Sequence, residues 1–243
     1  MRALRFSRRV FLEIVRDPLT LFFGLGFPAV LIILLSVIQK NIPVELFEIE
    51  RLVPGVTVFG LSFMTLFSAT TVASDRESAL LTRLYATPMR ASDFILGYTL
   101  PLIPISLLQA VACYIIAIPF GLKPDLNLLF SLLGIIPASL VFIGLGLAFG
   151  SILTQKQVGG ICGALLTNLT AWLSGVWFDL ELVGGVFKKI AAALPFYHAV
   201  NMERLLFTGT FDGFFENFAV VLVYALAALT ASVILFIKQM KKG

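Results

Sequence analysis

Charged residues are scarce in this chain: 13% of its 243 residues are charged, whereas 59% are hydrophobic. Soluble domains carry roughly a quarter charged residues, so a chain this apolar has too little polar surface to stay dissolved. The composition therefore excludes an ordinary soluble protein and indicates an integral membrane protein. No long polar block interrupts the sequence, which favours a single domain over residues 1–243.

Cysteine and histidine are also scarce. Cys113 and Cys162 both lie inside apolar runs, where they are expected to be small buried hydrophobes without a disulfide framework. The single histidine, His198, has no second histidine or cysteine near it in the sequence. We therefore expect no metal site.

Catalytic and nucleotide-binding motifs are missing as well. The chain contains no H-E-x-x-H, no G-x-S-x-G and no G-x-x-x-x-G-K-S/T loop, so it is not expected to be an enzyme or to bind ATP itself. The apolar runs also lack the ionisable residues that ion-coupled transporters use as relays. We expect no catalytic residue and no cofactor in this chain, and energy for uphill transport would have to come from a partner.

Apolar runs long enough to cross a bilayer occupy most of the sequence, since a spanning helix requires about 20 mostly apolar residues. We predict an all-α membrane protein with six spans: 19–38, 54–74, 94–118, 128–153, 158–178 and 218–237. Residues 1–17 precede the first span. They place Leu4, Phe11, Ile14 and Val15 on one helical face opposite several arginines, which is typical of an amphipathic helix in the membrane interface that Pro18 ends.

Basic residues are distributed unevenly between the two sides of the predicted spans. With both termini in the cytoplasm, cytoplasmic segments hold twelve of the 18 basic residues and external segments hold six. The positive-inside rule therefore favours cytoplasmic N- and C-termini. The rival explanation of the basic balance, a nucleic-acid surface, is disfavoured because the arginines are scattered and no soluble domain is present.

The segment 75–93, between the second and third spans, is charged and has helical periodicity. Ser74 followed by Glu77 fits a capping box at a helix start, Pro88 is expected to stop the helix, and Asp93 to cap the next one. We predict a short amphipathic helix on the cytoplasmic side. An ordinary solvated loop is the alternative that the pattern alone leaves open.

Polar and aromatic residues within two spans suggest a path for a substrate. The second span places Phe59, Phe63 and Phe67 four residues apart on one face, and the fifth span contains Asn168 and Thr170. An uncharged path for an amphipathic substrate would use such rings, amides and hydroxyls. The alternative is helix–helix packing, in which hydroxyls bond to backbone and small residues allow close approach.

The external segment 179–217 is too long for a simple loop and only half polar. Its apolar stretches, punctuated by Pro195 and Gly209, are too short to span a bilayer. Short helices that re-enter the outer leaflet, or a small cap over the outer mouth, would both fit.

Taken together, these features resemble the membrane subunits of bacterial ABC-2 type ABC transporters. The resemblance covers the whole chain, and it is strongest at Asp75-Arg76-Glu77-Ser78 followed by Leu80-Leu81-Thr82-Arg83-Leu84-Tyr85-Ala86-Thr87-Pro88-Met89. It is reinforced by Arg16-Asp17-Pro18 before the first span and by Leu194-Pro195-Phe196-Tyr197 running into Glu203-Arg204-Leu205-Leu206.

The resemblance implies a permease that dimerises, pairs with two copies of a separate ATPase subunit and lies in the bacterial cytoplasmic membrane, with ATP and Mg on the partner. It implies that segment 75–93 is a coupling helix seated on the ATPase, that 1–17 is an elbow helix, and that 179–217 is re-entrant. The residues expected to contact the ATPase are Glu77, Leu80, Leu81, Arg83, Leu84 and Tyr85. Those expected to line the path are Phe59, Phe63, Phe67, Asn168 and Thr170.

We therefore predict the membrane subunit of an ATP-driven exporter, a homodimer in contact with lipid and not with nucleic acid. The substrate is expected to be a hydrophobic or amphipathic small molecule such as a drug or antibiotic. The alternatives are an exporter of a lipid-linked or polysaccharide substrate, and an uncoupled channel or secondary carrier.

Overall fold

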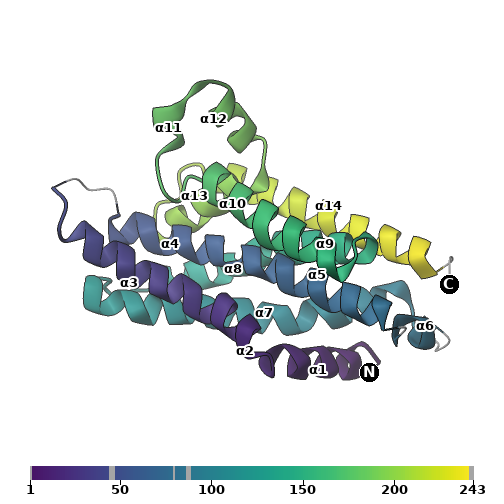
Figure 1. The fold of residues 1–243 in the computed structure, drawn as a ribbon. Helices are drawn as coiled ribbons and strands as arrows, with labels where there is room; N and C mark the ends of the chain where they lie inside the picture. Colours follow the sequence, from purple (N-terminus) through teal and green to yellow (C-terminus); the bar gives the residue numbers. More distant parts are fainter. Residues whose placement is uncertain (1, 44–46, 79, 86–88, 241–243) are drawn as a thin grey trace.

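The computed structural model describes residues 2–43, 47–78, 80–85 and 89–240. In these ranges the chain is helical without strands, and the long helices run side by side along one axis (Figure 1). The first half comprises α1 Arg2–Val15, α2 Pro18–Leu21, a π-helical turn Phe22–Gly26, α3 Phe27–Gln39, α4 Ile49–Gly60, α5 Ser62–Glu77 and α6 Leu80–Tyr85. The second half comprises α7 Ala91–Ala117, a 3₁₀ turn Ile118–Phe120, α8 Asn127–Ile152, α9 Gln155–Val158, a π-helical segment Gly159–Leu166, α10 Thr167–Leu173, α11 Leu180–Val183, α12 Gly185–Ala192, α13 Pro195–Thr208 and α14 Phe214–Met240.

Five helical stretches among the described residues are long and apolar enough to cross a membrane. They are Pro18–Gln39, Ile49–Glu77, Ala91–Phe120, Asn127–Ile152 and Phe214–Gln239. Each overlaps one of the predicted spans. The fifth predicted span, 158–178, coincides with α9, the π-helical segment and α10, which follow one another without a break but are not among the five. A span there, and with it the total of six, stays a prediction.

The stretch α4–α5 lies at the centre of the bundle, and α8 packs closely along α5. The close approach depends on glycine, because a Cβ on Gly146 would overlap the hydroxyl of Ser68 and the carbonyl of Thr65. The contact is also polar: Thr65 Oγ1 donates to the carbonyl of Phe142 at 2.8 Å. Small residues and hydroxyls thus join these two helices as expected for helix packing in lipid.

A local change of helical pitch separates α4 from α5. At Leu61 the backbone N–H bonds to Val58 O at 3.0 Å instead of to the residue four positions back. This arrangement leaves the carbonyl of Thr57 free, and the side chain of Gln109 on α7 donates to it at 3.0 Å. A buried backbone acceptor is therefore satisfied by a neighbouring helix.

The N-terminal helix α1 packs against α7 and not only against lipid. Its buried side chains are Phe6, Val10 and Ile14, and Phe6 contacts the ring of Tyr98 with centroids 4.9 Å apart. Of the predicted apolar face, Ile14 is buried, whereas Leu4, Phe11 and Val15 are exposed. An amphipathic helix therefore occupies Arg2–Val15, with one apolar stripe packed on protein and another exposed. Its position in the membrane interface stays a prediction.

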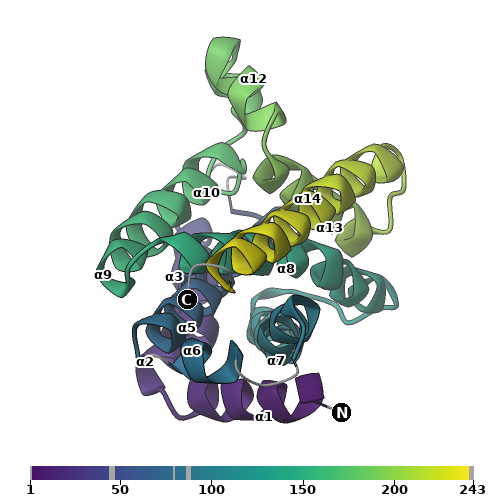
Figure 2. The same ribbon diagram turned by 90° about the vertical axis from the view of Figure 1, so that its right-hand side faces the viewer.

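The predicted external segment 179–217 contains three helices with different surroundings. The short helices α11 and α12 project from the bundle, and α12 stands apart from the end where α1 and α6 lie (Figure 2). In contrast, α13 packs against α4, α8 and α14. Its depth in a membrane, and therefore its re-entrant character, stays a prediction.

Candidate functional site

A network of charged and polar side chains joins three helices at the end of the bundle that carries α1 and α6. Asp75, in the last turn of α5, is 2% exposed and accepts two hydrogen bonds of 2.6 Å from the guanidinium of Arg9 on α1. The hydroxyl of Tyr98 on α7 donates to the same carboxylate at 2.8 Å. Arg9 also pairs with Glu13 at 3.0 Å, and its hydrogen bonds to Asp75 raise the pKa of the guanidinium. The carboxylate is fully compensated despite its burial.

The two residues after Asp75 join α5 to the turn between α8 and α9. Arg76 donates to the carbonyl of Ser151 at 2.5 Å and to that of Leu153, which are free carbonyls at the C-terminal end of α8. Glu77 accepts from the backbone N–H of Gln155 at 2.8 Å, at the start of α9. The last turn of α5 is therefore bonded to α1, α7, α8 and α9.

These contacts correct the predicted helix start. Ser74 and Glu77 were expected to form a capping box, but both lie within α5, and the short helix α6 begins at Leu80. A capping box is a local pattern, and here the tertiary bonds of Asp75, Arg76 and Glu77 are made by a continued helix instead. Asp93 was expected at the N-cap of the next helix, but α7 begins at Ala91 with Arg90 as its N-cap. Asp93 caps this helix from the third helical position instead, where its carboxylate accepts from the backbone N–H of Arg90 at 2.9 Å. Pro88 lies outside the described residues.

The predicted ATPase-contacting residues are divided between surface and core. Arg83 is exposed, and Glu77 is exposed although it also bonds to α9. Leu81 is buried at 1% exposure, while Leu80 and Leu84 are half-buried, with Leu84 packed against the hydrophobic core. Tyr85 is the last residue of α6, and the structure does not describe its side chain. The assignment of these six residues to an ATPase contact stays a prediction, and Arg83 is the side chain best placed to test it.

The three phenylalanines predicted for the path form a continuous row along α4 and α5. Ring centroids are 6.1 Å apart for Phe59 and Phe63, and 6.5 Å apart for Phe63 and Phe67. Phe63 also contacts Phe23 and Phe27 of the first span, at 5.9 and 5.7 Å. Phe59 at the other end of the row contacts Trp177 at 5.5 Å, and all three rings are buried within the chain.

The two polar residues predicted for the path lie on different sides of α10. Asn168 is exposed, and its side chain donates to Ala164 O at 2.8 Å within its own helix. Thr170 is buried, and its hydroxyl donates to Leu166 O at 2.9 Å. The chain does not bring either residue into the phenylalanine row, and their role in a path stays a prediction.

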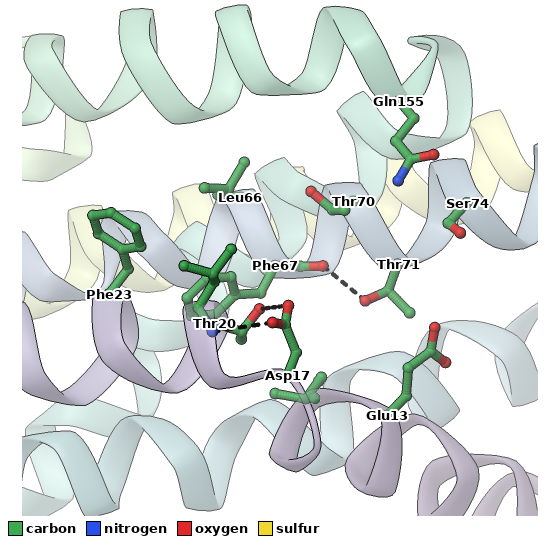
Figure 3. A pocket seen from close by; sticks show the side chains of 12 residues that line it. Glu13, Asp17, Thr20, Phe23, Leu66, Phe67, Thr70, Thr71, Ser74 and Gln155 are labelled. Carbon is green, nitrogen blue, oxygen red and sulfur yellow. Dashed lines mark hydrogen bonds between the residues drawn. The ribbon is translucent and has the colours of Figure 1, made fainter.

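Phe67 also lines a cavity that the sequence did not single out (Figure 3). The cavity has a volume of about 320 Å³ and lies between the segment Glu13–Thr20 with Phe23, residues 66–74 of α5, and Gln155 at the start of α9. Glu13 and Asp17 point toward α5, and Thr70 and Thr71 extend from α5 into the same space. This is a pocket of mixed polarity next to the Arg9–Asp75 network.

The burial of one acid was not predicted. Glu203 on α13 is 0% exposed, so the chain holds a buried ionisable residue outside the apolar runs, where none was expected. Its Oε2 accepts from the hydroxyl of Ser131 on α8 at 2.7 Å, and Ser131 Oγ lies 2.7 Å from the hydroxyl of Tyr114. Its Oε1 has no hydrogen-bond partner in the described part of the chain. Burial raises the pKa of Glu203 to about 8.

A signal for this burial was present in the sequence. The positions three and four residues from Glu203 on each side are apolar: Ala199, Val200, Leu206 and Phe207. On a helix these residues share the face of Glu203, which places its carboxyl within an apolar stripe. The segment 179–217 was interpreted as a half-polar external segment, and the helical spacing of these apolar residues was not considered.

Five apolar helices long enough to cross a membrane, in a bundle without strands over the described ranges, define a multi-pass, all-helical membrane protein. The chain belongs to the ABC-2 type transporter family, whose model matches residues 4–208. The predicted resemblance is thereby confirmed, and the chain is the membrane component of an ABC transporter, a class of protein that works with an ATPase. No curated protein matches the chain.

Proposed function

We propose that this chain is the permease subunit of an ATP-driven exporter, that two copies form the path, and that each copy contacts one ATPase subunit through α6. The chief support is the bonding of the last turn of α5 to four other helices. A helix that transmits movement must be joined rigidly to the spans that it moves. α6 follows this braced turn almost directly, so a force on α6 would reach several helices together.

Reversing the charge of Arg83 tests the coupling role. Because Arg83 is exposed on α6, Arg83→Glu should leave the fold intact and place a repelling charge in the contact with the ATPase. We expect substrate-stimulated ATP hydrolysis by the reconstituted complex to fall about tenfold, the usual scale for a charge reversed at an interface.

The matched control is Lys189→Glu, the same charge change at an exposed position on α12, far from α6. It should retain full ATP hydrolysis. Equal activity of the wild type and Arg83→Glu would remove α6 from the ATPase contact.

We also propose that the end with α1 and α6 faces the cytoplasm, supported by the excess of basic residues there. Single cysteines at Arg83 and Lys156 should then be shielded from an impermeant thiol reagent added to intact cells, whereas cysteines at Lys123 and Lys188 should react. The two native cysteines are buried, so they should give little background. Labelling of the Arg83 cysteine from outside, with Lys188 protected, would reverse the orientation.

For the substrate we propose a hydrophobic or amphipathic small molecule such as a drug or antibiotic. The phenylalanine row and the mixed-polarity cavity beside it support this choice. One argument against a secondary carrier was the lack of ionisable residues that could relay ions. The buried Glu203 weakens that argument. Membership of a family that works with an ATPase still favours ATP as the energy source.

A further inference from the structure

The cavity between the N-terminal segment and α5 has two chemically distinct ends. Ile14, Leu19, Phe23, Leu66 and Phe67 supply apolar surface, whereas carboxylates, hydroxyls and an amide supply the rest. At about 320 Å³ the cavity falls at the lower end of the range for small-molecule sites. It can therefore hold the body of a compact amphipathic molecule together with a polar group.

The polar end is acidic. Glu13 and Asp17 line the cavity, and among the described residues no lysine or arginine does, although arginines are abundant at this end of the bundle. Glu13 shares Arg9 with Asp75, so the guanidinium compensates it only in part. Burial raises the pKa of Glu13, as expected for a carboxylate whose charge is incompletely stabilised. No cationic side chain among the described residues pairs with Asp17.

Two of the four hydroxyls that line the cavity, those of Thr20 and Thr71, are oriented as acceptors toward it. Thr20 Oγ1 donates its proton to Asp17 at 2.6 Å, and Thr71 Oγ1 donates to Phe67 O at 2.9 Å. Each hydroxyl has already used its one hydrogen, so toward the cavity its oxygen can only accept hydrogen bonds through its lone pairs. The apolar end adds two aromatic rings, from Phe23 and Phe67, and aromatic faces attract cations.

We infer that this cavity binds an organic monocation with an apolar or aromatic body. The charged centre would lie near Glu13 and Asp17, and the apolar groups around it would contact Phe23, Leu66 and Phe67. This inference rests on the proposed function as a transporter and names the substrate class of its permease. An organic anion of the same shape would meet two carboxylates and outward lone pairs, so the site would reject it.

Binding of two probes of nearly equal size and opposite charge tests the inference. Tetraphenylphosphonium and tetraphenylborate would be equilibrated separately with the purified permease in nanodiscs of zwitterionic lipid, without an ATPase. We expect saturable binding of the phosphonium that an excess of unlabelled phosphonium displaces and tetraphenylborate does not.

Two conservative variants locate the site. Glu13→Gln leaves the Arg9–Asp75 pair in place, and Asp17→Asn keeps an oxygen that can cap α2. Each should weaken phosphonium binding about threefold, the scale of losing one exposed charge pair, because both carboxylates are exposed. Glu216→Gln, which removes an exposed acid from the first turn of α14, should bind as the wild type does.

Unchanged phosphonium affinity in the two variants, equal affinity for both probes, or no saturable phosphonium binding would each overturn the inference. A melting-temperature measurement on each variant confirms that it is folded before its affinity is interpreted. Because the ATPase is absent, a negative result here removes only the cation site. A failure of the proposed function would instead appear in the ATP hydrolysis of Arg83→Glu and its control.

Discussion

Replacing Arg9 with methionine is expected to lower the melting temperature of the detergent-purified protein by about 5 °C. Methionine preserves the length and apolar contacts of the arginine stem. Of the partners that the structure describes for the Asp75 carboxylate, which is 2% exposed, it leaves the Tyr98 hydroxyl alone. Breaking a fully buried ion pair costs about 3–5 kcal/mol, and the partial exposure of Arg9 reduces this to about 2 kcal/mol. Thermal unfolding followed by tryptophan fluorescence or light scattering measures the change.

Arg8→Met is the matched control, because Arg8 is an exposed arginine on the same helix. It should melt within about 1 °C of the wild type, as expected for a surface substitution. The double variant Arg9→Met/Asp75→Leu should recover part of the loss, since no charge is then left buried. If Arg8→Met and Arg9→Met lowered the melting temperature equally, the ion pair between Arg9 and Asp75 would not contribute to stability.

The second large effect is expected at Glu203, as a change in how stability depends on pH. Burial raises the pKa of this carboxyl from 4.5 to about 8, so the folded state holds the proton in a range where the unfolded state releases it. The resulting stability is fully present below pH 4.5 and is lost as the pH rises toward 8. The slope within that window is at most about 1.4 kcal/mol per pH unit.

Glu203→Gln should abolish this contribution while keeping the shape of the side chain, since the hydroxyl of Ser131 can accept from the amide. Melting temperatures of the wild type and the variant between pH 5.5 and 8.5 should therefore diverge, with the variant losing less as the pH rises. Glu216→Gln removes an exposed acid and should follow the wild type at every pH. Parallel curves for wild type and Glu203→Gln would mean that Glu203 is ionised in the folded protein.

The sequence predicted the helices well because their signals are local. Long apolar runs, the amphipathic pattern of 1–17 and the cap at Asp93 depend on neighbours within a few positions, and all three appear in the structure. The same locality produced the error at Ser74, where a short motif suggested a helix start. A continued helix was favoured instead, because it brings Asp75 and Arg76 to partners on other helices.

The site was less accessible to sequence reasoning because its contacts join distant residues. Arg9 and Asp75 are separated by 66 positions, and Ser131 and Glu203 by 72, and no local pattern pairs them. The path residues illustrate a further gap: the side of α10 that bears Asn168 is exposed in one chain. What that side contacts lies outside the chain, and the sequence of one chain does not determine it.

The bonding of the last turn of α5 also fixes an order of assembly during synthesis. Arg9 has already been made when Asp75 emerges from the ribosome, so this carboxylate can find its charged partner as soon as the second span inserts. Arg76 and Glu77, by contrast, have partners at Ser151, Leu153 and Gln155, which are made much later. Until then an arginine and a glutamate at the membrane surface depend on water and lipid headgroups. The hydrogen bonds at this end of the bundle can therefore all form only after the fourth span and the start of α9 have been synthesised.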